Sequence, residues 1–194
     1  MSRTGRVRRA TTETSVDVAL DLDGSGEIAV ETGVPFFDHM LHQLAAHGRV
    51  DLQIQAQGDL AVDAHHTVED VGIGLGQAFR AAVGDARGIV RFASVHAPMD
   101  DALVLAALDI SGRPYLHYGL TLERTLLGTF ATDLTEEFFR AFVSQAALTL
   151  HLLQVHGRNA HHIIEAAFKG TGLALHRASR IVGDSVPSTK GVLG

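Results

Sequence analysis

The chain has 194 residues, of which 46% are hydrophobic and 20% charged, a composition typical of a folded globular protein and not of a disordered one. Its net charge of −6 argues against a nucleic-acid partner, and no stretch approaches the roughly eighteen apolar residues of a membrane span. The lack of cysteine excludes disulfides, thiolate metal ligands and a cysteine nucleophile, and is consistent with a cytoplasmic location, whereas twelve histidines are present.

The first part of the chain predicts a β-β-α-β-α unit. Alternation of polar and apolar residues predicts strands at residues 8–22, 27–33 and 50–58. Helical periodicity, with a proline at one start and glycines at the ends, predicts helices at residues 35–48 and 65–84.

The second part repeats this order. Strands are expected from two of three segments, either the first with the second or the second with the third: residues 88–99, 101–111 and 113–123. A helix, a strand and a long helix follow at residues 133–148, 148–157 and 160–182, before a tail rich in Gly, Pro and Ser at residues 183–194.

This order predicts an α+β fold made of two duplicated halves, residues 1–85 and residues 86–194. Each half would pack its helices on one face of an antiparallel sheet, and a pseudo-twofold axis would relate the halves within one compact unit.

The sequence Ala-His-His-x-x-Glu occurs once in each half, near the start of the last helix: His65, His66 and Glu69, then His161, His162 and Glu165. Adjacent histidines on a helix point about 100° apart, so each pair is better placed to serve two ions than one. One copy alone is most simply a hydrogen-bonded polar cluster favoured by the helix dipole. Two matching copies favour a pair of metal sites, and nitrogen and oxygen donors suit Mn, Fe, Co, Ni or Zn better than Ca.

Other features are weaker when taken singly. The segment GIGLG at residues 72–76 lies inside a predicted helix and indicates close helix packing rather than nucleotide binding. His39 and Gln43 share one helix face, which makes His39 a candidate ligand beside the doubled motif. Four cations would form an anion pocket if the fold brought them together: Arg91, Arg113, Lys169 and Lys190.

Six segments in order resemble the imidazoleglycerol-phosphate dehydratase family of histidine biosynthesis, in its monofunctional form: RRATTET, PFFDHMLHQLAAHG, DAHHTVEDVGIGLG, APMDDALVLAALDISGRPYL, NAHHIIEAAFKGTGLAL and VPSTKGVLG. The resemblance extends from about Arg8 to Gly194. It implies a duplicated α+β fold, a hollow homo-24-mer with active sites shared between subunits, and two Mn²⁺ ions per active site.

The resemblance also implies roles for particular residues. The metal ligands would be His39, His65, His66, Glu69, His161, His162 and Glu165. The substrate would be contacted by Glu13, Gln43 and Lys169, and its phosphate by Arg91, Arg113, Ser188 and Lys190. The proton carriers would be among Glu13, Glu69 and Glu165.

Glu137 departs from the family pattern, because many relatives have a ligating histidine at this position. Its carboxylate either replaces that imidazole as a metal ligand or only gains from the helix dipole. The neighbouring sequence predicts a capping box, with Asp133 as N-cap and Glu136 at the third helical position.

The implied reaction is the loss of water from imidazole glycerol phosphate to give imidazole acetol phosphate. The hydrogen removed lies on a carbinol carbon with no carbonyl beside it, so the imidazole ring must act as the electron source. A ring held as imidazolate between two metals would expel the adjacent hydroxyl, and the diazafulvene-like intermediate would lose the neighbouring proton.

Two other functions fit part of the pattern. A dimetal hydrolase would use a metal-bound water to attack an ester or amide. A symmetric metal-binding cage would use its histidines only to join subunits, which leaves Glu13 and the basic residues without a role.

Overall fold

Each half of the chain forms a four-stranded mixed sheet in the computed structural model, which describes residues 3–193. The first sheet has the order β1 (Thr4–Ala10), β2 (Thr14–Asp21), β4 (Asp51–Gly58), β3 (Ile28–Glu31). The second sheet has the matching order β5 (Phe92–Met99), β6 (Ala102–Asp109), β10 (Thr149–His156), β7 (Tyr115–Gly119). The last pair of each sheet is parallel and the other pairs are antiparallel.

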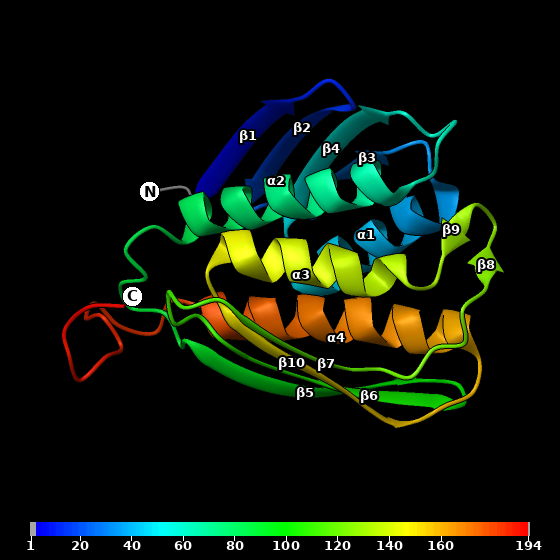
Figure 1. Ribbon diagram of the computed structural model, residues 1–194. Helices are drawn as coiled ribbons and strands as arrows, with labels where there is room; N and C mark the ends of the chain where they lie inside the picture. Colours follow the sequence, from blue (N-terminus) through cyan, green and yellow to red (C-terminus); the bar gives the residue numbers. More distant parts are fainter. Residues whose placement is uncertain (1–2, 194) are drawn as a thin grey trace.

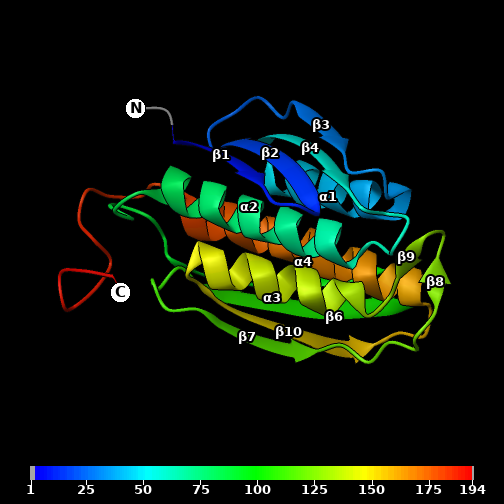
Figure 2. The same ribbon diagram turned by 45° about the horizontal axis from the view of Figure 1, so that its top comes forward.

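Four helices fill the space between the two sheets (Figures 1 and 2): α1 (Pro35–Gly48), α2 (His65–Val83), α3 (Leu134–Ala146) and α4 (Ala160–Ser179). α2 packs on β1 and β2, α4 packs on β5 and β6, and the helices of one half contact those of the other, α1 against α4 and α2 against α3. A short hairpin of β8 (Leu126–Leu127) and β9 (Phe130–Ala131) precedes α3. The predicted duplicated α+β architecture is confirmed, but each four-stranded sheet contains one strand more than predicted, and the β8–β9 hairpin of the second half was not predicted.

Strand alternation directs apolar side chains inward, as Val16, Val18 and Leu20 of β2 are all buried. Between the sheets the core is rich in phenylalanine. Phe37 of α1 lies edge-on to Phe138 of α3, with ring centroids 5.4 Å apart, and so joins the two halves. Burial of one such side chain contributes about 1.5–3 kcal/mol, so aromatic packing stabilises the contact between the two halves.

The predicted close helix packing at GIGLG is confirmed. A Cβ on Gly72 would lie 2.9 Å from the carbonyl oxygen of Phe138, and one on Gly76 would lie 2.5 Å from that of Phe142. The same close approach occurs between α1 and α4, where a Cβ on Gly172 of α4 would lie 2.2 Å from the carbonyl oxygen of Leu44. Glycine at these positions therefore lets the helix backbones approach each other.

Three expectations about local structure are wrong. The single strand expected at residues 8–22 is a hairpin, because the hydroxyl of Thr11 accepts the backbone N–H groups of Glu13 and Thr14 and turns the chain. The sheets are not wholly antiparallel, because β3 and β7 each join the edge of their sheet in parallel. In the second half all three candidate segments form strands.

The predicted capping box is also wrong. Asp133 has helical backbone angles and makes no side-chain cap to α3. Its carboxylate pairs instead with Arg124, and that of Glu136 pairs with Arg140 one turn along the helix. Within residues 3–193, no helix is long and apolar enough to cross a membrane.

Candidate active site

Three candidate ligands from both halves meet between α1 and α4. Nε2 of His161 lies 3.1 Å from Oε2 of Glu165, one helical turn away, and Nε2 of His39 lies 3.6 Å from the same oxygen. The three donor atoms lie within 4.8 Å of one another. Packing of α1 on α4 therefore creates a compact set of two imidazoles and one carboxylate.

Glu165 is buried, with 4% of its surface exposed, yet it is surrounded by groups that favour its charged form. Burial raises its pKa, but Lys169, with Nζ 2.6 Å from Oε1, together with His161 and His39, brings that pKa below the ordinary value. The carboxyl group is thus ionised at neutral pH and can serve as a metal ligand.

The donor set fits a divalent transition metal, since imidazole and carboxylate donors suit Mn, Fe, Co or Zn. In the part of the chain that the structure describes, it is the only group of three such donors this close together. The first copy of the motif makes no equivalent cluster: His65 and His66 begin α2, and Glu69 is exposed one turn later. Glu137 lies in the first turn of α3, the helix that packs against α2.

The second histidine of each copy is held by a carboxylate. Nδ1 of His66 lies 3.1 Å from both carboxylate oxygens of Asp59, a contact that raises the pKa of His66. Nδ1 of His162 lies 2.7 Å from Asp101. That hydrogen bond, with two backbone N–H groups donated to the carboxylate by Arg158 and Asn159, holds the pKa of Asp101 far below its usual range.

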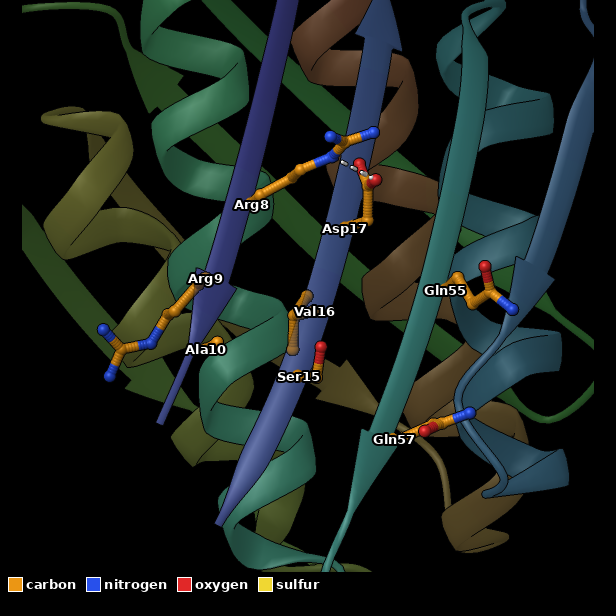
Figure 3. Close-up of a pocket in the computed structure, with 8 residues that line it drawn as sticks. All are labelled: Arg8, Arg9, Ala10, Ser15, Val16, Asp17, Gln55 and Gln57. Atoms are coloured by element: carbon orange, nitrogen blue, oxygen red, sulfur yellow. Dashed lines mark hydrogen bonds and ion pairs between the residues drawn. The ribbon is translucent and has the colours of Figure 1, made fainter. Parts of the chain in front are cut away.

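Glu13 lies in the turn between β1 and β2, where its Oε2 is 3.9 Å from Nδ1 of His66. A partly buried network fastens this turn to α2: Asp70 accepts hydrogen bonds from Nε of Arg9, at 2.9 Å, and from the hydroxyl of Thr14. Figure 3 shows Arg9 extending away from its neighbour Arg8, as successive residues of a strand do. The network therefore places Glu13 beside the first residues of α2.

Arg91 organises the C-terminal tail. Its guanidinium makes two hydrogen bonds to Asp109, of 2.7 and 3.1 Å, and a third, of 2.8 Å, to the backbone oxygen of Pro187. The guanidinium carbon also lies 4.5 Å from the ring centroid of Phe92. Its backbone has a φ of 79°, a conformation that a residue other than glycine adopts only when its surroundings impose it.

The other candidate phosphate contacts lie near this tail. The segment before Arg113 is tied to Arg91 by the hydrogen bond from the amide of Ile110 to the oxygen of Arg91. Ser188 directly follows Pro187, and its hydroxyl accepts the N–H of Lys190 at 3.2 Å. The structure thus gathers Arg91, Ser188 and Lys190 in one region.

Lys169 and Gln43 belong elsewhere. Lys169 faces Glu165, so it is part of the histidine cluster and not of the tail. Gln43 lies one turn after His39 on α1, on the same helix face.

The histidine cluster and the tail lie at opposite ends of α4 (Figure 1). His161 stands in the first turn, whereas Arg91 donates its backbone N–H to the oxygen of Ala178 in the last. At about 1.5 Å per residue, the helix from His161 to Ala178 is about 25 Å long. A small substrate cannot reach both ends of the helix within one copy of the chain.

The surface hollows on the first sheet lie away from these groups. Two, of about 490 and 430 Å³, lie on the outer face of the first sheet and share Asp17 and Gln55. In Figure 3 Arg8 reaches across this face to Asp17, with Nε to Oδ2 of 2.8 Å. Among the described residues no histidine lines either hollow, and Arg6, Arg8 and Arg9 there are paired with Asp17 or Asp70. This face therefore carries none of the proposed chemistry.

Three carboxylates at the site had no signal in the sequence: Asp59, Asp101 and Asp109. Each contacts a candidate residue on a different segment of the fold. Neither helical nor strand spacing in the sequence indicates these pairs. Asp101 and His162, for example, are 61 residues apart.

Comparison with known proteins gives a consistent answer. A family model described as imidazoleglycerol-phosphate dehydratase matches residues 32–175. The imidazoleglycerol-phosphate dehydratase of Synechococcus sp. (strain WH7803) is 53% identical over 196 residues, covering 100% of this chain and 97% of that protein. The protein of the same name from Moorella thermoacetica (strain ATCC 39073 / JCM 9320) is 52% identical, and 100% of both chains is covered.

Solved structures agree. The imidazoleglycerol-phosphate dehydratase of Staphylococcus aureus subsp. aureus N315 has a TM-score of 0.84 at 38% identity, over 92% of this chain and 99% of that one. The structure of IGPD from Pyrococcus furiosus in complex with (S)-C348 has a TM-score of 0.85 at 40% identity, over 96% and 100% of the two chains.

The duplicated α+β fold, its histidine–carboxylate cluster and these relatives define a hydro-lyase, an enzyme that breaks a carbon–oxygen bond by removing water. The chain belongs to the imidazoleglycerol-phosphate dehydratase family.

Proposed function

We propose that this enzyme converts D-erythro-imidazole glycerol phosphate to imidazole acetol phosphate and water in histidine biosynthesis, and that it requires Mn²⁺. The observation that supports the metal requirement is the cluster of His39, His161 and Glu165, whose donors lie within 4.8 Å of one another. A cytoplasmic location is part of the same proposal and rests on the family's biosynthetic role.

The substrate's imidazole is the electron source for the reaction. Loss of the ring proton allows the ring to expel the hydroxide on the adjacent carbon and leaves a neutral, diazafulvene-like system. The next carbon then loses its proton, and the resulting enol becomes the ketone. One oxygen and two hydrogens leave as water, so the step needs no oxidant or reductant.

When bound, two divalent ions per site would act as Lewis acids toward the two ring nitrogens. We assign His39, His161 and Glu165 to one ion. The ligands of the other would come from the remaining candidates, in this and neighbouring copies: His65, His66, Glu69, Glu137 and His162.

The glutamates differ in their fitness for proton transfer. Glu165 is buried, ionised and bonded to Lys169, so it is better suited to ligation than to carrying a proton. Glu13 has 54% of its side chain exposed and lies 3.9 Å from Nδ1 of His66. We therefore assign proton transfer to Glu13, a contribution of about 10²–10⁴-fold in rate, with Glu69 as the next candidate.

The phosphate would bind to the tail region, through Arg91, Arg113, Ser188 and Lys190. Because this region and the histidine cluster are at opposite ends of α4, a complete site requires the tail of one copy and the cluster of another. This separation supports a homo-oligomer with shared sites, for which we propose the 24-mer of the family. Lys169 and Gln43 would contact the substrate at the histidine end.

The test is a direct assay. Protein freed of metal with a chelator is incubated with imidazole glycerol phosphate, with and without Mn²⁺, and the ketone product is measured. Product formation that needs Mn²⁺ supports the proposal. No product at any metal concentration, or equal rates in a chelator, would refute it.

A further inference from the structure

Each copy of the His-His motif makes a hydrogen bond to an aspartate that lies outside the motif. In each copy the second histidine, His66 or His162, places its Nδ1 against an aspartate, Asp59 or Asp101. The ring–carboxylate distances, 3.1 and 2.7 Å, are those of charge-assisted hydrogen bonds.

Duplication of the fold does not account for both contacts. Asp59 directly follows β4, after Gly58, whereas Asp101 lies in the turn between β5 and β6. In the second half the residue after the glycine that follows β10 is Arg158, a cation. The two halves therefore provide the same hydrogen bond from different elements, which indicates that the bond itself is what the site requires.

The chemistry of the contact fixes the proton on the ring. An ionised carboxylate only accepts hydrogen bonds, so a neutral imidazole that faces it must carry its hydrogen on Nδ1. The lone pair then lies on Nε2, and a carboxylate partner both orients the ring and strengthens that nitrogen as a ligand.

We propose that Asp59 and Asp101 are positioning residues, which set His66 and His162 to bind metal through Nε2. This inference rests on the metal dependence proposed above. Neither aspartate touches the substrate or an ion in this assignment; each acts through its histidine.

The surroundings of the two rings fit this assignment. Nε2 of His162 has the carboxylate of Asp100 at 3.5 Å, but 72% of that side chain is exposed. On the Nδ1 side of His66, Glu13 is farther than Asp59, at 3.9 against 3.1 Å. Asp101 is itself held by the backbone N–H groups of Arg158 and Asn159, so it is fixed before any ion binds.

The test compares Mn²⁺ affinity, measured by calorimetric titration of metal-free protein, in wild type and in variants of each aspartate. Asp59→Ala removes the acceptor, and we expect about 10- to 100-fold weaker binding. Asp59→Asn keeps an oxygen that can accept the ring N–H but loses the charge, so a smaller loss is expected. For Asp101 the Asn variant is used, because its amide oxygen can still accept the backbone N–H groups.

Asp85→Ala serves as the matched control, since Asp85 is exposed and pairs only with Arg87, its neighbour in sequence, among the described contacts. Its affinity should equal that of wild type. The thermal midpoint of the metal-free proteins shows whether a variant is misfolded. If Asp59→Ala is misfolded, the Mn²⁺ affinities of the Asp59→Asn and Asp101→Asn variants test the inference.

The outcomes separate the two proposals. Wild type that binds no Mn²⁺ would refute the proposed function, and this inference with it. Wild type that binds Mn²⁺, with folded Asp59→Asn and Asp101→Asn variants that bind it as tightly, would overturn the inference alone. Weaker binding in the Asp59 and Asp101 variants, with Asp85→Ala unchanged, supports it.

Discussion

His39 and Glu165 come from different halves of the chain, and Nε2 of the one lies 3.6 Å from Oε2 of the other. Their approach depends on the packing of α1 against α4, which Gly172 permits through its close contact with Leu44. The histidine–carboxylate cluster therefore forms only when the two halves pack together, so the proposed metal site depends on the duplicated fold.

His39→Ala should lower the Mn²⁺ content and remove most of the activity while leaving the fold intact. The His39 side chain is 45% exposed, so we expect stability to change by no more than about 0.5 kcal/mol. Metal analysis after dialysis and thermal unfolding measure the two effects. His42→Ala, an exposed position on the same helix, is the control and should behave as wild type. Full metal content in His39→Ala would remove this residue from the ligand set.

Lys169→Met should weaken Mn²⁺ binding most at low pH. The Lys169 ammonium lowers the pKa of Glu165, so without it that pKa rises and the carboxylate is protonated at a higher pH. Metal loss on acidification should begin at a higher pH than in wild type, as titrations from pH 8 to 5 would show. Loss of the partner of a buried carboxylate should also cost on the order of 3 kcal/mol of stability. Arg177→Met, exposed on the same helix, should change neither property.

Asp109→Asn should impair substrate binding without changing metal content. Asp109 holds the guanidinium of Arg91, which in turn holds the tail at Pro187, so its loss frees the region assigned to the phosphate. A hydrogen bond to a charged group is worth about 1.5–3 kcal/mol, so kcat/KM should fall about ten- to a hundredfold, mainly through KM. Trypsin should also cut the variant's tail faster. An unaltered KM would show that the tail needs no such support.

His176 should make stability depend on pH. Burial, with the charges of Arg49 and Arg180, lowers the pKa of His176 in the folded protein. The unfolded chain, in which the pKa of His176 is about 6.5, therefore binds a proton at a higher pH than the folded protein does. As the pH falls below about 6.5, the folded state loses stability relative to the unfolded state. The stability difference between wild type and His176→Gln should therefore shift in favour of wild type as the pH rises from 5 to 7.5. Thermal unfolding in a chelator tests this, and a difference independent of pH would contradict it.

Much of the fold was predictable because its signals are local. Alternation identified the strands, the proline and glycines identified α1, and the segment GIGLG indicated the close contact of α2 with a neighbouring helix. The errors also have local causes. Thr11 turns the chain through its hydroxyl, and Asp133 prefers an ion pair with Arg124 to a cap, which residue type alone does not reveal.

The residues of the histidine–carboxylate cluster could be named as candidates from the sequence, but the carboxylates that contact the other candidate residues could not. The doubled motif and the family resemblance named His39, His161 and Glu165 as candidates, and the packing of the helices shows that their donor atoms lie within 4.8 Å of one another. The partners Asp59, Asp101 and Asp109 depend on contacts across the fold. The separation of the cluster from the tail along α4 could likewise be seen only in three dimensions.

The most direct test of the whole account is complementation between two impaired variants. Glu165→Gln lacks a proposed metal ligand but keeps its tail, whereas Lys190→Ala keeps the cluster but lacks a proposed phosphate contact. If one site combines the cluster of one copy with the tail of another, mixed oligomers contain some sites with both parts intact. Equal co-expression should give about a quarter of wild-type Mn²⁺-dependent dehydratase activity, the share expected from random assembly. Activity no higher than that of the separately expressed variants would contradict the shared site.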